Sequence, residues 1–139
     1  MGNKINFING NFITLDELMD EVGIDVVRYF FLMRGMNTHL NFDMDIAKSE
    51  SDENPVFYLQ YAYARISNII RRSLDLKYDD LKTSNLSLLT TDVELELINS
   101  LIAFPDCISR VMKKLEPQII INYLQDIAIL FHRFYSKNK

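Results

Sequence analysis

Apolar residues recur every three or four positions along most of this chain, which is the spacing of one face of an α-helix. The periodic segments are separated by helix start and stop signals, and strand-like alternation is weak. Only the stretch Ile5–Ile13 has a pattern that allows short β structure or a hairpin. The pattern therefore predicts an all-α helical bundle with a short irregular N-terminal extension.

Two helices are expected to begin with a capping box, in which a threonine and a glutamate three residues later satisfy each other's backbone N–H groups. Thr14 and Glu17 form the first box, and Thr91 and Glu94 form the second. The first helix should end at Gly23, because glycine favours the backbone conformation that closes a helix.

The apolar segment after Gly23 predicts a second helix, capped by Asp25 and ending at Gly35. Since this helix is apolar on almost every side, we expect it to be buried. The polar, acidic stretch that follows predicts a loop with one short helix around Asp43–Lys48. Residues 75–91 lose the helical period and predict a linker inside the bundle.

Prolines mark the starts of the remaining helices, since proline is favoured in a helix's first turn. Pro55 should open the longest helix, which runs to about Leu74, and Pro105 and Pro117 should open the last two. In the helix after Thr91, the residues expected to face the core are Leu97, Ile98, Leu101 and Ile102. In the helix after Pro105 they are Ile108, Val111, Met112 and Leu115. In the helix after Pro117 they are Ile120, Tyr123, Leu124, Ile127, Phe131 and Phe134.

The longest helix carries two stripes when its residues are placed at about 100° intervals. The apolar stripe predicts its core face and comprises Leu59, Ala62, Ile66, Ile69, Ile70 and Ser73. The second stripe comprises Tyr58, Tyr61, Arg65, Asn68 and Arg72. Tyrosine rings stack on unpaired bases and arginine binds phosphate, so this stripe suits a single-stranded nucleic-acid loop. The same spacing is more often that of tyrosines at the edge of a core and of solvated arginines.

Composition and charge narrow the class of protein. The chain has 139 residues, 48% of them hydrophobic, and a net charge of −4. Residues 1–56 carry ten acids and four bases, whereas residues 57–139 carry nine acids and eleven bases. The basic second half keeps a nucleic-acid partner possible. No apolar run is long enough to span a bilayer and no signal peptide begins the chain, so we expect a cytoplasmic protein with no membrane partner.

No set of residues predicts an active site. His39 and His132 are far apart in sequence and are interpreted as structural, and Cys107 is interpreted as a buried small residue. The acidic residues between Asp43 and Glu53 do not match a calcium loop, and no glycine-rich phosphate loop occurs. The sequence predicts neither catalytic residues, nor a metal site, nor a cofactor in this chain.

Two stretches resemble arginyl-tRNA synthetase. The segment Gly10–Ile70 is similar to the passage from the class I catalytic region into the α-helical anticodon-binding, or DALR, domain, and NPVFYLQYAYARI (Asn54–Ile66) is its most specific part. EPQIIINYLQDIAILFHRFYS (Glu116–Ser136) resembles a later helix of that domain. The resemblance assigns residues 1–42 to the end of the catalytic region and residues 43–139 to the anticodon-binding domain, without its last helices.

The resemblance implies an arginine–tRNA ligase that uses ATP and Mg²⁺ when full length. The family's nucleotide-binding region would lie upstream of Met1, and Phe7 stands where a Lys-Met-Ser-Lys-type loop has its second lysine. Phenylalanine cannot stabilise phosphates as that lysine does. We therefore expect this chain to be inactive alone, either as an excised piece or as a stand-alone relative.

By the same resemblance, Tyr58, Tyr61 and Arg65 contact the anticodon loop of an arginine tRNA, together with the loop Lys48–Asn54. Asn68 and Arg72 are assigned to this site by spacing only. The alternative is a helical interaction or oligomerisation domain that no longer binds tRNA. A related class I enzyme, such as cysteinyl-tRNA synthetase, fits NPVFYLQYAYAR less well.

The last helix predicts a self-association surface, because its apolar residues surround much of its circumference. These residues are Ile119, Ile120, Ile121, Tyr123, Leu124, Ile127, Ile129, Leu130, Phe131 and Phe134. Without the last helices of the family's domain, these residues would be left uncovered. A second copy of the chain or a folded-back Ile5–Ile13 segment should then cover them.

Overall fold

The computed structural model describes residues 13–35, 38–73, 82 and 84–138. All regular elements in these ranges are helices, which confirms the predicted all-α fold. The helices are α1 (Leu15–Val22), α2 (Ile24–Leu32), α3 (Met44–Lys48), α4 (Pro55–Arg72), the short 3₁₀ helix η1 (Leu86–Leu88), α6 (Asp92–Ile102), α7 (Phe104–Lys114) and α8 (Gln118–Lys137). The possible hairpin at Ile5–Ile13 lies, except for Ile13, outside the described residues.

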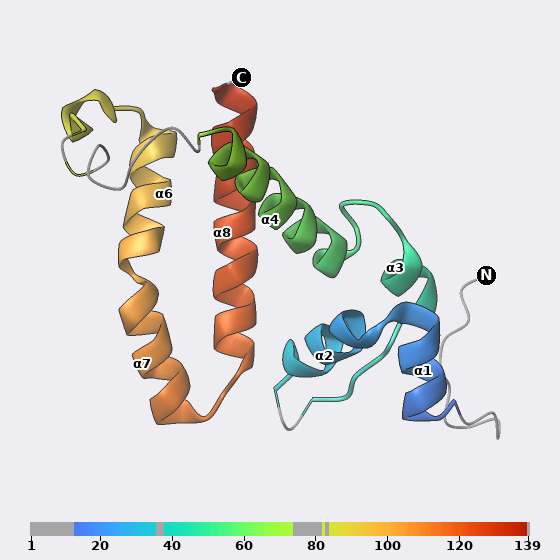
Figure 1. The fold of residues 1–139 in the computed structure, drawn as a ribbon. Coiled ribbons are helices and arrows are strands. Elements are labelled where there is room, and N and C mark those ends of the chain that lie inside the picture. The colour runs from blue at the N-terminus through green and yellow to red at the C-terminus, as the bar shows by residue number, and fades with distance from the viewer. Residues whose placement is uncertain (1–12, 36–37, 74–81, 83, 139) are drawn as a thin grey trace.

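The long helix α8 is the centre of the arrangement (Figure 1). Helices α6 and α7 follow each other along one side of α8 and run antiparallel to it, while α4 crosses α8 on another side. Helices α1, α2 and α3 gather around the start of α4, and α2 also packs against α8. The crossing of α4 and α8 is therefore held in place from the α1–α3 side.

Two groups of buried side chains hold the helices together. The larger group joins α1, α2, α3 and the first turns of α4 and α8, and comprises Leu18, Val27, Tyr29, Phe30, Phe42, Met44, Ala47, Val56 and Ile121. The smaller group lies where α4 meets α8 and comprises Ala62, Ala128 and Phe131. Two of its three members are alanines, so the two helix backbones approach closely at the crossing.

The first two helices follow each other without a connecting loop. The capping box of Thr14 and Glu17 is confirmed, and α1 ends at Gly23 as predicted. Gly23, with a positive φ of 87°, also precedes the first residue of α2, so Asp25 lies in the first turn and the prediction that it caps the helix is wrong. Helix α2 ends at Leu32, before Gly35, and its expected burial is only partial because Phe31 and Leu32 face solvent.

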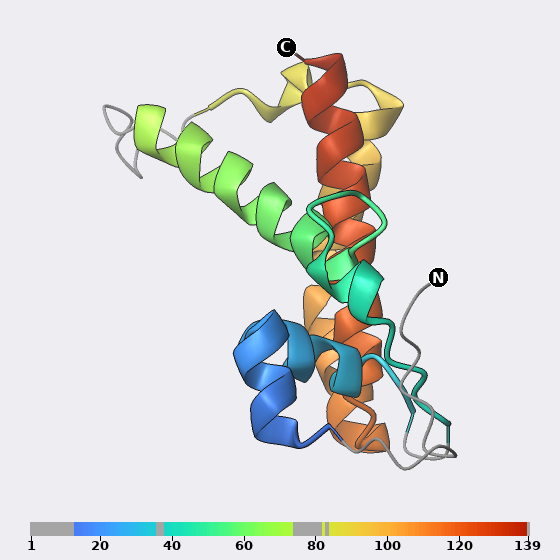
Figure 2. The ribbon, with the colours of Figure 1, turned by 90° about the vertical axis from the view of Figure 1, so that its right-hand side faces the viewer.

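Helix α4 begins at Pro55 as predicted and ends at Arg72, with Ser73 as its C-cap. Its predicted core face is right as far as Ile66 and wrong beyond it, because Ile69 and Ile70 are exposed, Ile70 by 62%. Figure 2 shows the reason: the C-terminal half of α4 extends away from α8. Among the described residues, no neighbouring helix therefore covers that half of the stripe.

The three helices after Thr91 also form, and the second capping box is confirmed. The last two helices start within one residue of the prolines that predicted them, since α7 begins at Phe104 and α8 at Gln118. Four residues predicted to face the core are exposed instead: Leu101, Ile102, Met112 and Leu115. Helices α6 and α7 are covered mainly by α8, and Leu115 is the left-handed C-cap of α7 with a φ of 55°.

The expectation that α8 has an uncovered apolar surface is wrong in its premise. Helices α4, α6 and α7 cover this helix, and of the ten apolar residues named for it only Ile129 is exposed, by 52%. Cys107 is fully buried, as interpreted from the sequence. Within the described ranges, no helix combines the length and apolar character needed to cross a membrane.

Candidate nucleic-acid interface

Three residues of the second α4 stripe, Tyr58, Tyr61 and Arg65, lie beside α8 at the crossing where Ala62 and Ala128 pack. There, Tyr58, Tyr61 and Arg65 contact side chains from the last turns of α8. The result is a cluster of aromatic and cationic groups that we call the crossing cluster; its members are Phe57, Tyr58, Tyr61, Arg65, His132 and Tyr135.

Arg65 is the charged centre of the crossing cluster. Its Nη2 donates a hydrogen bond to the Tyr61 hydroxyl over 2.7 Å, and its Nη1 lies 3.1 Å from His132 Nδ1. The guanidinium carbon is 4.1 Å from the Tyr61 ring centroid and 4.9 Å from that of Tyr135. These contacts hold the cation in place by hydrogen bonds and cation–π attraction. Its other N–H groups have no acceptor within the described part of the chain and can donate to a further group.

Tyr61 supplies the accessible ring of the cluster. Its side chain is 42% exposed, yet its ring is nearly parallel to that of Phe57, with centroids 6.0 Å apart. A ring that is exposed and already oriented is suited to stacking on an unpaired base.

Tyr58 is less accessible than the sequence suggested. It is half-buried, and its ring meets the His132 ring at 61° with centroids 4.5 Å apart. Burial raises the pKa of its hydroxyl, the nearby Asp52 carboxylate raises this pKa further, and the Arg65 cation opposes both effects. Tyr58 therefore packs inside the crossing cluster and supports it. The ring of Tyr61 is the one that the cluster exposes to solvent.

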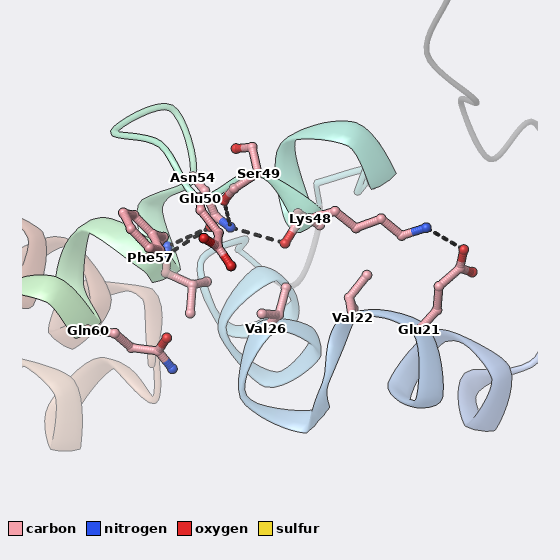
Figure 3. Close-up of a pocket in the computed structure, with 11 residues that line it drawn as sticks. Glu21, Val22, Val26, Lys48, Ser49, Glu50, Asn54, Phe57 and Gln60 are labelled. Carbon is pink, nitrogen blue, oxygen red and sulfur yellow. Dashed lines mark hydrogen bonds and ion pairs between the residues drawn. The ribbon is translucent and has the colours of Figure 1, made fainter.

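The remaining predicted site residues are not in the crossing cluster. Asn68 and Arg72 are exposed further along α4, on the half that extends away from α8. Lys48, at the end of α3, forms an ion pair with Glu21 of α1, and Figure 3 shows its side chain pointing away from Asn54 and Phe57. The structure thus brings three of the six predicted residues together and leaves Lys48 engaged elsewhere.

Asn54 fastens the predicted loop to the start of α4. Its side chain is 4% exposed, and its Oδ1 accepts hydrogen bonds from the backbone N–H groups of Val56 and Phe57. Its Nδ2 donates to the carbonyls of Ala47 and Ser49. A cavity of about 300 Å³ opens beside this loop, between α1–α2 and the start of α4 (Figure 3).

Gln125 of α8 links this helix to α2 and to the start of α4. Its Nε2 donates a hydrogen bond to the hydroxyl of Tyr29 on α2 and another, of 2.7 Å, to the carbonyl of Pro55. Burial raises the pKa of the Tyr29 hydroxyl, and the hydrogen bond from Gln125 lowers it by less. A single amide thus ties α8 to both α2 and the first turn of α4.

Sequence reasoning missed Phe57, His132 and Tyr135. His132 is isolated from other candidate residues in the sequence, but in the structure it contacts Tyr58, Tyr61 and Arg65 across the crossing. The sequence signal for His132 and Tyr135 is the FHRFY run at Phe131–Tyr135, which is part of the resemblance given above. His39, in contrast, is an exposed loop residue.

Across the described ranges, no group of three or more histidine, cysteine, aspartate or glutamate side chains is placed to hold a metal ion. What the crossing cluster offers is stacking and hydrogen bonding.

Known proteins resemble this chain in sequence and in structure. The family model described as "DALR anticodon binding domain" matches residues 59–139. An arginine–tRNA ligase of Listeria welshimeri is 45% identical over 136 residues, and one of Salinibacter ruber is 42% identical over 133 residues. These matches cover 98% and 96% of this chain, which spans about a quarter (24%) of each relative's length.

A solved structure agrees with these matches. A chain described as an arginyl-tRNA synthetase from Campylobacter jejuni superposes with a TM-score of 0.81 at 35% identity, over 94% of this chain and 28% of that one. The family match covers α6, α7, α8 and most of α4, which are the helices that build and support the crossing cluster. This chain therefore belongs to the DALR anticodon-binding domain family.

Proposed function

We propose that this chain is the part of an arginine–tRNA ligase that binds the anticodon loop of an arginine tRNA. The observation that carries the proposal is the Tyr61–Arg65 pair, an exposed ring and a cation already fixed against each other. The family match and the ligase relatives support the same function. They favour it over an interaction domain that has lost tRNA binding.

In this proposal, an anticodon base stacks on the exposed ring of Tyr61, and Arg65 donates a free N–H group to a neighbouring phosphate. Asn68 and Arg72 extend the contact along the exposed end of α4. Lys48 reaches RNA only after leaving Glu21. Because exposed ion pairs contribute only about 0–1 kcal/mol, that exchange costs little.

The reaction itself belongs to the proposed full-length enzyme. Its ATP-dependent aminoacylation and its Mg²⁺ requirement are expected of the regions that this chain does not include, and this chain supplies recognition of the tRNA. We place that activity in the cytoplasm, where the ligase would meet its tRNA.

The test is binding of this chain to an anticodon stem-loop of arginine tRNA, followed by fluorescence anisotropy. Tyr61→Ala removes one base stack and should weaken binding by ~1–3 kcal/mol. Arg65→Ala should weaken binding and reduce the slope of log K against log salt concentration by about one, since one phosphate contact is lost.

Two matched controls separate this site from general effects. Tyr63→Ala removes a tyrosine of α4 outside the crossing cluster that is 74% exposed, and Arg110→Ala removes an exposed arginine from α7. Both should bind the stem-loop as the parent does. Equal binding by all four variants and the parent, with circular dichroism showing intact helices, would contradict the proposal.

Self-association is a separate proposal, and the exposed apolar residues of α6 and α7 support it in place of α8. Ile102, Met112 and Leu115 are each exposed by 69% or more. Two copies that pair through these faces would remove them from water, which is favourable at about 25 cal/mol per Å² of apolar surface.

A further inference from the structure

His132 makes two polar contacts to α4, one through each ring nitrogen. Its Nε2 lies 3.3 Å from the backbone carbonyl oxygen of Tyr58, and its Nδ1 lies 3.1 Å from Nη1 of Arg65. The ring also packs against both tyrosines, edge-on to Tyr58 and roughly parallel to Tyr61 at 5.7 Å between centroids. The imidazole is therefore held by α4 on several sides.

The chemistry of the two partners fixes where the imidazole proton resides. A backbone carbonyl can only accept a hydrogen bond, so Nε2 must donate. A guanidinium can only donate, so Nδ1 must accept. Both contacts are satisfied together by the neutral imidazole with its proton on Nε2.

The charged groups around the imidazole agree with this arrangement. From α4, the guanidinium of Arg65 and the hydroxyl-bearing rings of Tyr58 and Tyr61 face it. On its own helix, Arg133 is turned to an ion pair with Glu96 of α6, away from the crossing. A lone pair on Nδ1 is thus placed against the cation of Arg65.

We propose that His132 is a positioning residue that holds Arg65 over Tyr61 before RNA arrives. This inference rests on the proposed anticodon-binding function. An arginine side chain free in solvent loses rotamer freedom when it binds phosphate, and a side chain already held in place loses less. His132 Nδ1 and the Tyr61 hydroxyl fix the two Nη atoms, so the remaining N–H groups point in a set direction.

Two substitutions separate the acceptor atom from the ring. His132→Phe keeps an aromatic ring against Tyr58 and Tyr61 but has no acceptor for Arg65. His132→Asn loses the ring but can place its amide oxygen where Nδ1 lies. Stem-loop binding should weaken about three- to tenfold in His132→Phe, which corresponds to the net contribution of one ordinary hydrogen bond, and stay within about twofold of the parent in His132→Asn.

The effect of His132 should act through Arg65. In an Arg65→Ala background, His132→Phe should cause no further weakening, because the side chain that it positions is gone. Further weakening there, or weaker binding by His132→Asn than by His132→Phe, would overturn the proposal. Parent-like binding by His132→Phe would overturn it as well.

A measurement without RNA tests the same assignment independently. Long-range ¹H–¹⁵N correlation spectra of the free chain report which ring nitrogen carries the proton, and we expect Nε2–H for His132. A proton on Nδ1 would overturn the proposal. If the parent shows Nε2–H but binds no stem-loop, the proposed function is wrong. His132 then has no role in RNA binding, although its contact with Arg65 is confirmed.

Discussion

Asn54 uses both atoms of its side-chain amide to join the loop before α4 to the helix itself. Two backbone N–H groups of the first turn donate to its Oδ1, and its Nδ2 donates to the carbonyls of Ala47 and Ser49. Since the side chain is buried, a shortened variant would leave these four backbone groups without the partners that Asn54 gives them.

We predict that Asn54→Ala lowers the free energy of unfolding by ~2 kcal/mol, measured by urea denaturation. Asn54→Ser keeps a cap for α4 and loses only the two donated bonds, so it should cost ~1 kcal/mol. Asn85→Ala is the control, because Asn85 caps the exposed 3₁₀ helix η1 and should cost less than either. Equal losses in all three variants would show that burial of Asn54 has no effect.

At the scale of single residues, the sequence located part of the crossing cluster. Tyr58, Tyr61 and Arg65 share one face of one helix, so spacing alone could bring them together. His132 lies 67 residues from Arg65, and nothing in local periodicity relates the two positions. That Tyr61 and Arg65 bind RNA remains a prediction.

The two capping boxes show how single side chains stabilise whole helices. In each box the backbone N–H of the threonine donates to the glutamate, over 2.8 Å from Thr14 and 2.9 Å from Thr91. These hydrogen bonds, with a smaller contribution from the threonine side chain, lower the pKa of Glu17 and Glu94 below the ordinary value of 4.5. The ionised glutamates therefore favour the folded chain.

Because the pKa of each glutamate is lowered by folding, this stabilisation is present above pH 4.5 and is lost as the pH falls through the folded-state pKa. Thermal unfolding followed from neutral to acidic pH should show that loss. The double variant Glu17→Gln and Glu94→Gln should lose less stability over the same window. Glu53→Gln, in the loop before α4, serves as control; a double variant with the parent's acid dependence would contradict the argument.

At the scale of elements, the sequence predicts where helices begin and end better than it predicts which of their residues are buried. A capping box is made by residues three positions apart, so it is visible in the sequence alone. Whether Ile70 or Ile102 is covered depends on how far a neighbouring helix reaches, and periodicity does not report that. Gly23 illustrates the remaining error, since one residue with a positive φ serves both α1 and α2 and displaces Asp25 from the cap.

For the whole molecule, the exposed apolar faces of α6 and α7 make self-association testable. We expect sedimentation velocity to show a faster species as protein concentration rises. Met112→Lys, on α7, should shift the chain towards the monomer, whereas Leu88→Lys, equally exposed on η1, should not. A monomer at every concentration would contradict association.

The measurement that tests the central claim most directly is an NMR titration of the chain with an anticodon stem-loop of arginine tRNA. If α4 and α8 bind RNA at their crossing, backbone and side-chain signals of Phe57, Tyr61, Arg65 and His132 should shift first and most, followed by those of Asn68 and Arg72. Signals of α7, including that of Arg110, should stay unchanged. Shifts confined to α6 and α7, or no shifts at concentrations where the stem-loop is in excess, would contradict the account.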